Sequence, residues 1–163
     1  MRKRIGFVAL LAMLLLAAMA LPAIARGHIF QANLTTGAEV HEVAASNATG
    51  HATFTVTDEG IEFTLKANRL TGPAWGAHIH GPAGTDANAG IVARLCGLPP
   101  VAPAPECTTD DNGKLRVGGL ITQENLSDGW TMESLIELLE SGNSYVNVHT
   151  DLNPPGEIRG QVR

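Results

Sequence analysis

Charged and aromatic side chains are scarce in this sequence of 163 residues: Asp, Glu, Lys and Arg make up 17%, and Phe, Trp and Tyr only 4%. Coiled coils and long surface helices need many charged positions, so the composition argues against both. Glycine and proline are plentiful, at 18 and 9 residues, and both favour tight turns. The composition therefore predicts many short strands joined by turns.

Positive charge is also scarce. Eleven Lys and Arg face 16 Asp and Glu, which gives a formal charge of −5. Three of the basic residues, Arg2, Lys3 and Arg4, lie at the extreme N-terminus, and the remainder of the chain carries −8. Nucleic acids and anionic membrane surfaces are bound through a positive field. We therefore expect neither of them as a partner.

The sequence has a single long apolar run, from Ile5 to Leu21. It follows the basic start and precedes the small-residue pattern Ala23-Ile24-Ala25, and these are the three parts of a secretory signal. We expect residues 1–25 to be a signal peptide and residues 26–163 to be an exported domain, periplasmic or secreted. A retained membrane anchor is the alternative, because the run is close to the shortest length that spans a bilayer. After cleavage no membrane span would remain.

Cysteine occurs only twice, at Cys96 and Cys107, on either side of a proline-rich stretch. In an oxidising compartment such a pair is expected to form a disulfide. Closing a loop of this length stabilises a fold by roughly 3 kcal/mol on the chain-entropy model. A metal site at this pair would need further ligands at short spacing, and the sequence has none there.

Apolar and polar residues alternate in most of the remaining segments, which is the pattern of half-buried strands. The clearest case is residues 52–57 and 61–67, which flank the turn sequence Asp58-Glu59-Gly60 and predict a hairpin. The other expected strands cover residues 28–34, 75–80, 91–95, 114–122, 144–150 and 156–163.

Helical spacing occurs once, where Met132, Leu135, Ile136 and Leu139 follow a possible N-cap at Thr131, and Gly142 is a natural stop. About eight strands with one short surface helix and no βαβ repeat predict an all-β fold, an antiparallel Greek-key β-sandwich.

Three motifs are more specific than this fold class. They are Ala-His-Ile-His-Gly-Pro at residues 77–82, Tyr-Val-Asn-Val-His-Thr at residues 145–150, and Pro-Gly-Glu-Ile-Arg-Gly-Gln at residues 155–161. Together they resemble the chordin-type domain, CHRD. The resemblance implies an exported domain that is not known as a catalytic unit. This sequence departs from the usual pattern at His41, in a segment that commonly carries prolines, and at His51, where a small residue is more usual.

Histidines form the best candidate site. His78 and His80 are two residues apart, so a strand presents both on one face, and His149 occupies the equivalent face of its own strand. If the two strands are neighbours, three imidazoles converge and could bind copper or zinc. His41, His51 or His28 could add a ligand, and Asn147, Glu157 and Arg159 are candidates for the surrounding shell, with Glu157 or Asp151 orienting a ring. Affinity should then weaken near pH ~6.5, where free imidazoles take up protons.

Two other interpretations remain open. The same polar residues could form a hydrogen-bonded network that only holds the fold, in a non-catalytic module that binds a protein or an envelope component. A His-x-His strand on a sandwich with a disulfide also resembles copper/zinc superoxide dismutase, but the loop after His80 lacks the further histidines that such a centre needs. A redox enzyme is therefore the least supported function.

Overall fold

The structure is a computed structural model that describes residues 27–97 and 104–163. The expected signal peptide and the middle of the proline-rich stretch lie outside the described residues. The strands are β1 (Ile29–Thr35), β2 (Thr49–Val56), β3 (Ile61–Asn68), β4 (Ala74–His80), β5 (Ile91–Gly97), β6 (Leu115–Ile121), β7 (Tyr145–Thr150) and β8 (Ile158–Gln161). The helix α1 spans Met132–Glu140, and two short 3-10 helices, η1 (Thr36–Ala38) and η2 (Gln123–Asn125), were not predicted.

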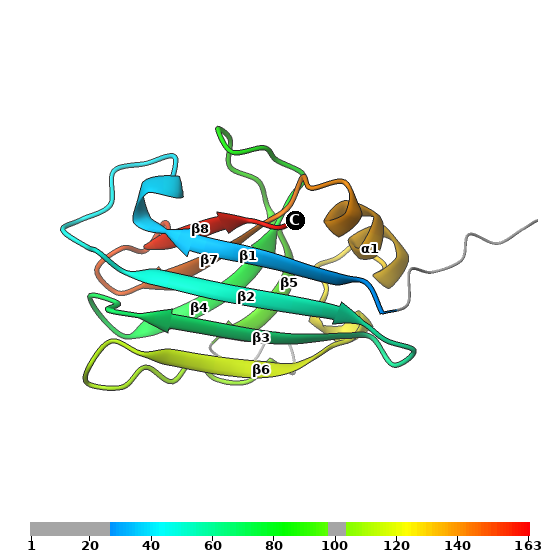
Figure 1. Ribbon diagram of the computed structural model, residues 1–163, viewed down its shortest axis with the longest axis horizontal. Coiled ribbons are helices and arrows are strands. Elements are labelled where there is room, and N and C mark those ends of the chain that lie inside the picture. Colours follow the sequence, from blue (N-terminus) through cyan, green and yellow to red (C-terminus); the bar gives the residue numbers. More distant parts are fainter. Residues whose placement is uncertain (1–26, 98–103) are drawn as a thin grey trace, which may run out of the picture.

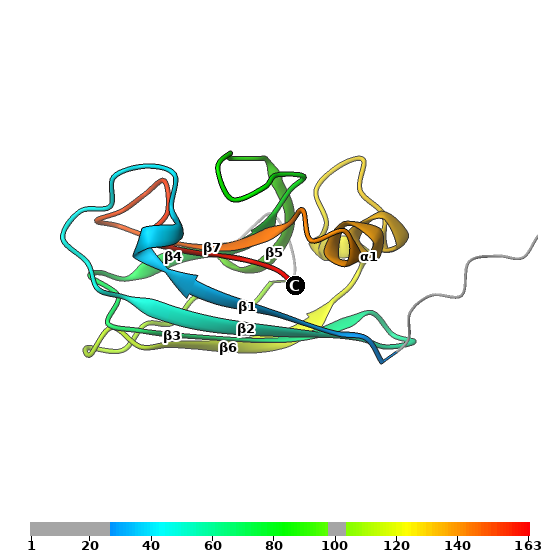
Figure 2. The ribbon, with the colours of Figure 1, turned by 45° about the horizontal axis from the view of Figure 1, so that its top comes forward.

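All eight strands belong to one antiparallel sheet with the order β5-β4-β7-β8-β1-β2-β3-β6. The sheet folds over, so that β4, β5 and β7 lie in a layer above β1, β2, β3 and β6 (Figure 2). The two end strands of this order, β5 and β6, also come into contact. The result is a nearly closed sandwich, and the predicted all-β fold is confirmed (Figure 1).

The predicted hairpin is formed by β2 and β3. Phe54 pairs with Phe63 and Ala52 with Leu65, and these apolar residues are buried while their neighbours along each strand are more exposed. The alternation that predicted the strands therefore also defines the face that contributes to the core.

The helix α1 begins at the predicted N-cap, where the Thr131 side chain accepts a hydrogen bond from the Ser134 amide. Gly142 has φ of 69°, a left-handed conformation that suits glycine after a helix end. Leu135 and Leu139 are buried against the end of the sandwich. Within the described ranges, no helix has both the length and the apolar character that crossing a membrane requires.

The predicted disulfide joins Cys96, at the end of β5, to Cys107, in the segment that leads to β6. Next to it, the Gly97 amide donates a hydrogen bond to the Pro105 carbonyl at 3.0 Å. The covalent link therefore lies where the two ends of the sheet meet.

The strand β7 is buried at all six positions, on both of its faces. One face contributes Val146 and Val148 to the core. The other lies under the connection between η1 and β2 and under the connection between β4 and β5, the cyan and green loops of Figure 2. These two loops enclose a polar layer on the outer face of the sheet.

Candidate metal centre

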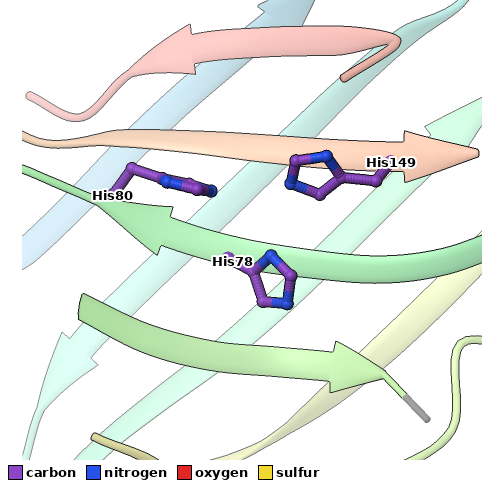
Figure 3. A group of neighbouring side chains, drawn as sticks. All are labelled: His78, His80 and His149. Carbon is purple, nitrogen blue, oxygen red and sulfur yellow. The ribbon is translucent and has the colours of Figure 1, made fainter. Parts of the chain in front are cut away.

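Three histidines meet in this polar layer. The strands β4 and β7 are antiparallel neighbours, with His78 paired to Asn147 and Gly76 paired to His149. His78, His80 and His149 project from the same outer face, and one ring nitrogen of each lies within 4.8 Å of the others (Figure 3). The structure thus brings together the three residues that the strand pattern selected.

Backbone carbonyls orient two of the rings. The Nδ1 atom of His80 lies 3.0 Å from the Ala89 carbonyl oxygen, and Nδ1 of His149 lies 3.0 Å from that of Pro154. A carbonyl can only accept, so each Nδ1 carries the proton and each Nε2 keeps a lone pair. Both Nε2 atoms are buried without a hydrogen-bond partner, and so is Nδ1 of His78.

Burial lowers the pKa of all three rings. The pKa of His78 falls from 6.5 to about 3 because of burial and, secondarily, because His149 and His80 lie beside it. The pKa of His149 falls to about 4, again mainly through burial, and burial also lowers the pKa of His80. The rings are therefore neutral at neutral pH, which is the state that binds metals.

Aromatic side chains surround the histidines. The Trp75 ring lies 4.9 Å from that of His149, and the Tyr145 ring stacks on His80 with centroids 5.0 Å apart and planes only 7° from parallel. The Arg159 guanidinium lies over the Tyr145 ring, 3.5 Å from its centre. This packing restricts the orientation of His80 and His149.

The loop between β4 and β5 is tied down over the site by β8. Arg159 donates hydrogen bonds to the Gly84 and Ala87 carbonyls and to Asn88 Oδ1, at 2.7, 2.9 and 3.0 Å. Gln161 donates to the Ala83 carbonyl at 2.8 Å. Because this loop also contains Ala89, which orients His80, Arg159 supports the histidines indirectly.

The expectation that Glu157 orients a ring is wrong. Its carboxylate accepts hydrogen bonds from Ser46, Thr71 and Thr150, in a separate buried network that joins loops at the end of the sheet. Asp151 does not orient a ring either: its amide donates to the Pro73 carbonyl, and the carbonyl oxygens of Ala89 and Pro154 orient the rings instead. Asn147 lies beside the histidines, but its Nδ2 atom donates to Glu39, at 3.4 Å.

The additional histidines lie apart from the three-residue cluster. His51 is on the exposed face of β2, where its Nδ1 lies 2.9 Å from Asn33 Oδ1. His28 is exposed at the start of β1, 3.9 Å from Glu140. His41 lies in the loop after η1 and contacts Glu39 and Gly156 rather than the three rings.

Sequence reasoning missed Glu39, whose side chain is completely enclosed. Burial raises the pKa of its carboxyl to about 7, although Arg159 and Asn147 both oppose the rise. A signal was present, because Glu39 is the only Asp, Glu, Lys or Arg between Arg26 and Glu42. Burying a carboxylate is costly unless it is paired, so its enclosure indicates a partner.

The donor set suits copper or zinc. Three neutral imidazoles on rigid strands match the nitrogen ligands that both metals accept, with one coordination position left for another group. Bonds of 2.0–2.1 Å in tetrahedral geometry hold nitrogens about 3.4 Å apart. The rings, with nitrogens up to 4.8 Å apart, would have to draw together slightly around an ion.

Comparison with known families identifies the fold. The family model of the CHRD domain matches residues 30–162, almost the whole of the described chain. A search of the curated proteins finds no match. The match includes the strand that carries His78 and His80, the strand that carries His149, and the Arg159 strand beneath the covering loop. The chain therefore belongs to the CHRD domain family, as its three motifs predicted.

Proposed function

We propose that this CHRD domain is an exported, non-catalytic module that binds one copper or zinc ion through His78, His80 and His149. The observation that carries the proposal is the set of three buried ring nitrogens, one per histidine, that have no hydrogen-bond partner and belong to rings in mutual contact. Leaving buried polar atoms unpaired costs about 1–3 kcal/mol each. A bound ion would satisfy all three.

A purely structural hydrogen-bond network does not explain the unpaired ring nitrogens as well as a metal site does. Such a network is stable when its members pair with one another, as the carboxylate of Glu157 does with its hydroxyl and amide donors. His80 and His149 instead pair with backbone carbonyls, and each of the three rings keeps one buried nitrogen without a partner. Lone pairs repel one another, so this arrangement favours a cation between them.

A non-catalytic role is supported by the enclosure of the site. The exposed fractions of His78, His80 and His149 are only 6%, 7% and 7%. The loop held by Arg159 covers this face, and little surface remains for a substrate to reach the ion.

A docking role receives less support from the surface. A partner-binding module would present a contiguous apolar patch. The large apolar side chains exposed on the described part of the chain are on separate segments: Ile29 on β1, Val40 after η1, Leu120 on β6 and Leu152 after β7.

The test is the metal content of the untagged protein, recovered from the exported fraction of cells that express the full chain. We expect a chain that begins at Arg26 and carries copper or zinc, and we expect the His78→Ala/His149→Ala variant to lose one equivalent. The matched control is His28→Ala/His51→Ala, which removes one exposed and one half-buried histidine away from the three rings. A wild-type protein that stays metal-free after incubation with Cu²⁺ and Zn²⁺ would overturn the metal site. So would a folded His78→Ala/His149→Ala variant that carries as much metal as the wild-type protein. Retention of residues 1–25 would contradict cleavage of the signal and favour the membrane anchor.

A further inference from the structure

A second group of unpaired polar atoms lies next to the histidines, on the β8 side of Asn147. The Oε1 atom of Glu39 and the Oδ1 atom of Asn147 are both buried without a hydrogen-bond partner. Both atoms are acceptors. Both side chains are buried, so bulk water does not reach these atoms to donate a hydrogen bond. Two such atoms in one place indicate a missing donor or cation.

The two oxygens flank Gly156. A Cβ atom at this glycine would collide with Asn147 Oδ1, and it would lie 2.5 Å from Asn147 Nδ2 and 2.7 Å from Glu39 Oε1. Only a residue without a side chain fits there, and its φ of 141° also favours glycine. The backbone thus leaves both acceptors directed at the same small region.

His41 contributes a third acceptor. Its Nε2 atom lies 3.0 Å from the Gly156 carbonyl oxygen, so Nε2 carries the proton and Nδ1 keeps the lone pair. This Nδ1 atom lies 3.6 Å from Glu39 Oε2. This is too long for a hydrogen bond, but it is close to the separation of about 3.4 Å between two ligands of one tetrahedral ion with bonds near 2.1 Å.

We propose that Glu39, His41 and Asn147 form a second metal site, which takes a divalent ion of the zinc type. One carboxylate, one imidazole and one amide oxygen make a mixed oxygen and nitrogen set, and imidazole nitrogen and carboxylate oxygen are ligands that Zn²⁺ accepts. The site is distinct from the three-histidine cluster, because His41 is not among the residues whose ligand atoms gather there.

One neighbouring group limits the affinity of this site. The positive charge of Arg159 acts on Glu39 and opposes a second cation. We therefore expect the second site to bind more weakly than the three histidines.

The test uses the His78→Ala/His149→Ala variant, in which the first site is removed. Titration of this metal-free protein with Zn²⁺ at pH 8 should show one remaining equivalent, and Co²⁺ should give the visible absorption of a bound, low-symmetry ion. Adding His41→Gln should weaken binding at least tenfold, because it removes a ligand and the loss of even an outer-shell group costs that much. His41 is partly exposed, so this substitution should leave the fold intact.

Glu39→Gln in the same background should have the same effect, and His51→Gln is the matched control because His51 is half-buried on β2, where it contacts Asn33. A folded His78→Ala/His149→Ala variant that binds no Zn²⁺ would overturn the second site. It would not bear on the three-histidine site, because that site is tested on the wild-type protein. Unchanged binding in the His41→Gln variant, or loss of binding in the His51→Gln control, would equally overturn it. A water molecule between Glu39 and Asn147 would produce the first of these results.

Discussion

At the scale of single residues, the position of His78 depends on the absence of a side chain at Gly76. A Cβ atom there would lie 2.9 Å from Cε1 and 3.3 Å from Nε2 of the His78 ring. Since Gly76 pairs with His149 across the sheet, the ring of His78 leans over this glycine and reaches toward its partner strand. The closeness of the three imidazoles therefore depends on a residue that binds nothing itself.

Gly76→Ala should weaken metal binding at the three histidines by about tenfold, because the new methyl group pushes the His78 ring out of place. The fold should lose only about 1 kcal/mol, since an overpacked ring can shift. Competition titrations with a metal indicator measure the first quantity, and denaturant unfolding of the metal-free protein measures the second.

The control for this substitution is Gly90→Ala, because no atom lies within 4 Å of a Cβ at Gly90. Both variants add the same methyl group to a glycine close to the site. Equal metal affinities for Gly76→Ala and the wild-type protein would show that the ring does not need this position.

Residue patterns predicted the three histidines well, because strand periodicity and chain order were enough to place them on one face. The same reasoning could not find which group orients each ring. Carbonyl oxygens, such as those of Ala89 and Pro154, carry no sequence signal. That gap led to the wrong role for Glu157, a carboxylate of the expected type that faces other partners.

At the scale of elements, the strand β8 controls the loop that covers the site. Arg159 reaches three oxygens of residues 84–88 with its two terminal nitrogens. Its guanidinium also rests on Tyr145, which stacks on His80. One buried side chain thus connects β8, β7 and the loop.

Arg159→Lys should open the loop although it keeps the charge. An ammonium group cannot reach three acceptors in the plane of the guanidinium, and the loss of these bonds should cost about 2–4 kcal/mol. Hydrogen exchange of the amides in residues 83–90 should accelerate, and the bound metal should dissociate faster. Arg116→Lys, at an exposed position of β6, should change neither. Unaltered exchange in the Arg159→Lys variant would show that other contacts hold the loop.

Element boundaries were predicted to within a few residues wherever turns carry their own chemistry. The Asp110 side chain accepts from the amides of Asn112 and Lys114, and Gly113 has φ of 69°, as the turn sequence before β6 requires. What could not be predicted is that loops would bury the outer face of β4 and β7. Alternation of apolar and polar residues indicates a strand with one face in the core and one in solvent. It does not show whether loops from other parts of the chain cover the polar face.

At the scale of the whole molecule, the buried titratable groups determine how stability depends on pH. The unfolded chain protonates its histidines near pH 6.5, whereas the folded protein protonates His149 only near pH 4 and His78 only near pH 3. Between these values the unfolded state binds more protons, so stability is full above pH 6.5 and falls as the pH drops. The loss from His149 alone is on the order of 3 kcal/mol. Glu39 acts in the opposite sense between pH 4.5 and about 7, where the folded state binds a proton that the unfolded state does not. It offsets a similar amount of the lost stability.

The metal-free protein should therefore lose net stability between pH 6.5 and 4, because three histidines with lowered pKa values outweigh one carboxyl with a raised pKa. Unfolding by urea at a series of pH values measures this slope. The His78→Ala/His149→Ala variant should show a smaller slope, or one of opposite sign, since Glu39 then dominates. A wild-type stability that stays flat across this range would mean that the rings are solvated in the metal-free protein.

The same burial moves the pH at which metal is released. Exposed imidazoles lose metal as they protonate near pH 6.5, which is the behaviour that the sequence led us to expect. In the folded domain protons compete with the ion only near the lowered pKa values, about 4 for His149 and about 3 for His78. Metal should stay bound at pH 5.5 and be released between about pH 5 and 3, together with unfolding. Dialysis against buffers of decreasing pH, followed by elemental analysis and circular dichroism, measures at which pH the metal leaves and whether the protein is still folded there. Half-release near pH 6.5 from a protein that is still folded would place the metal on exposed histidines such as His28 or His51, and not in the enclosed layer between β4 and β7.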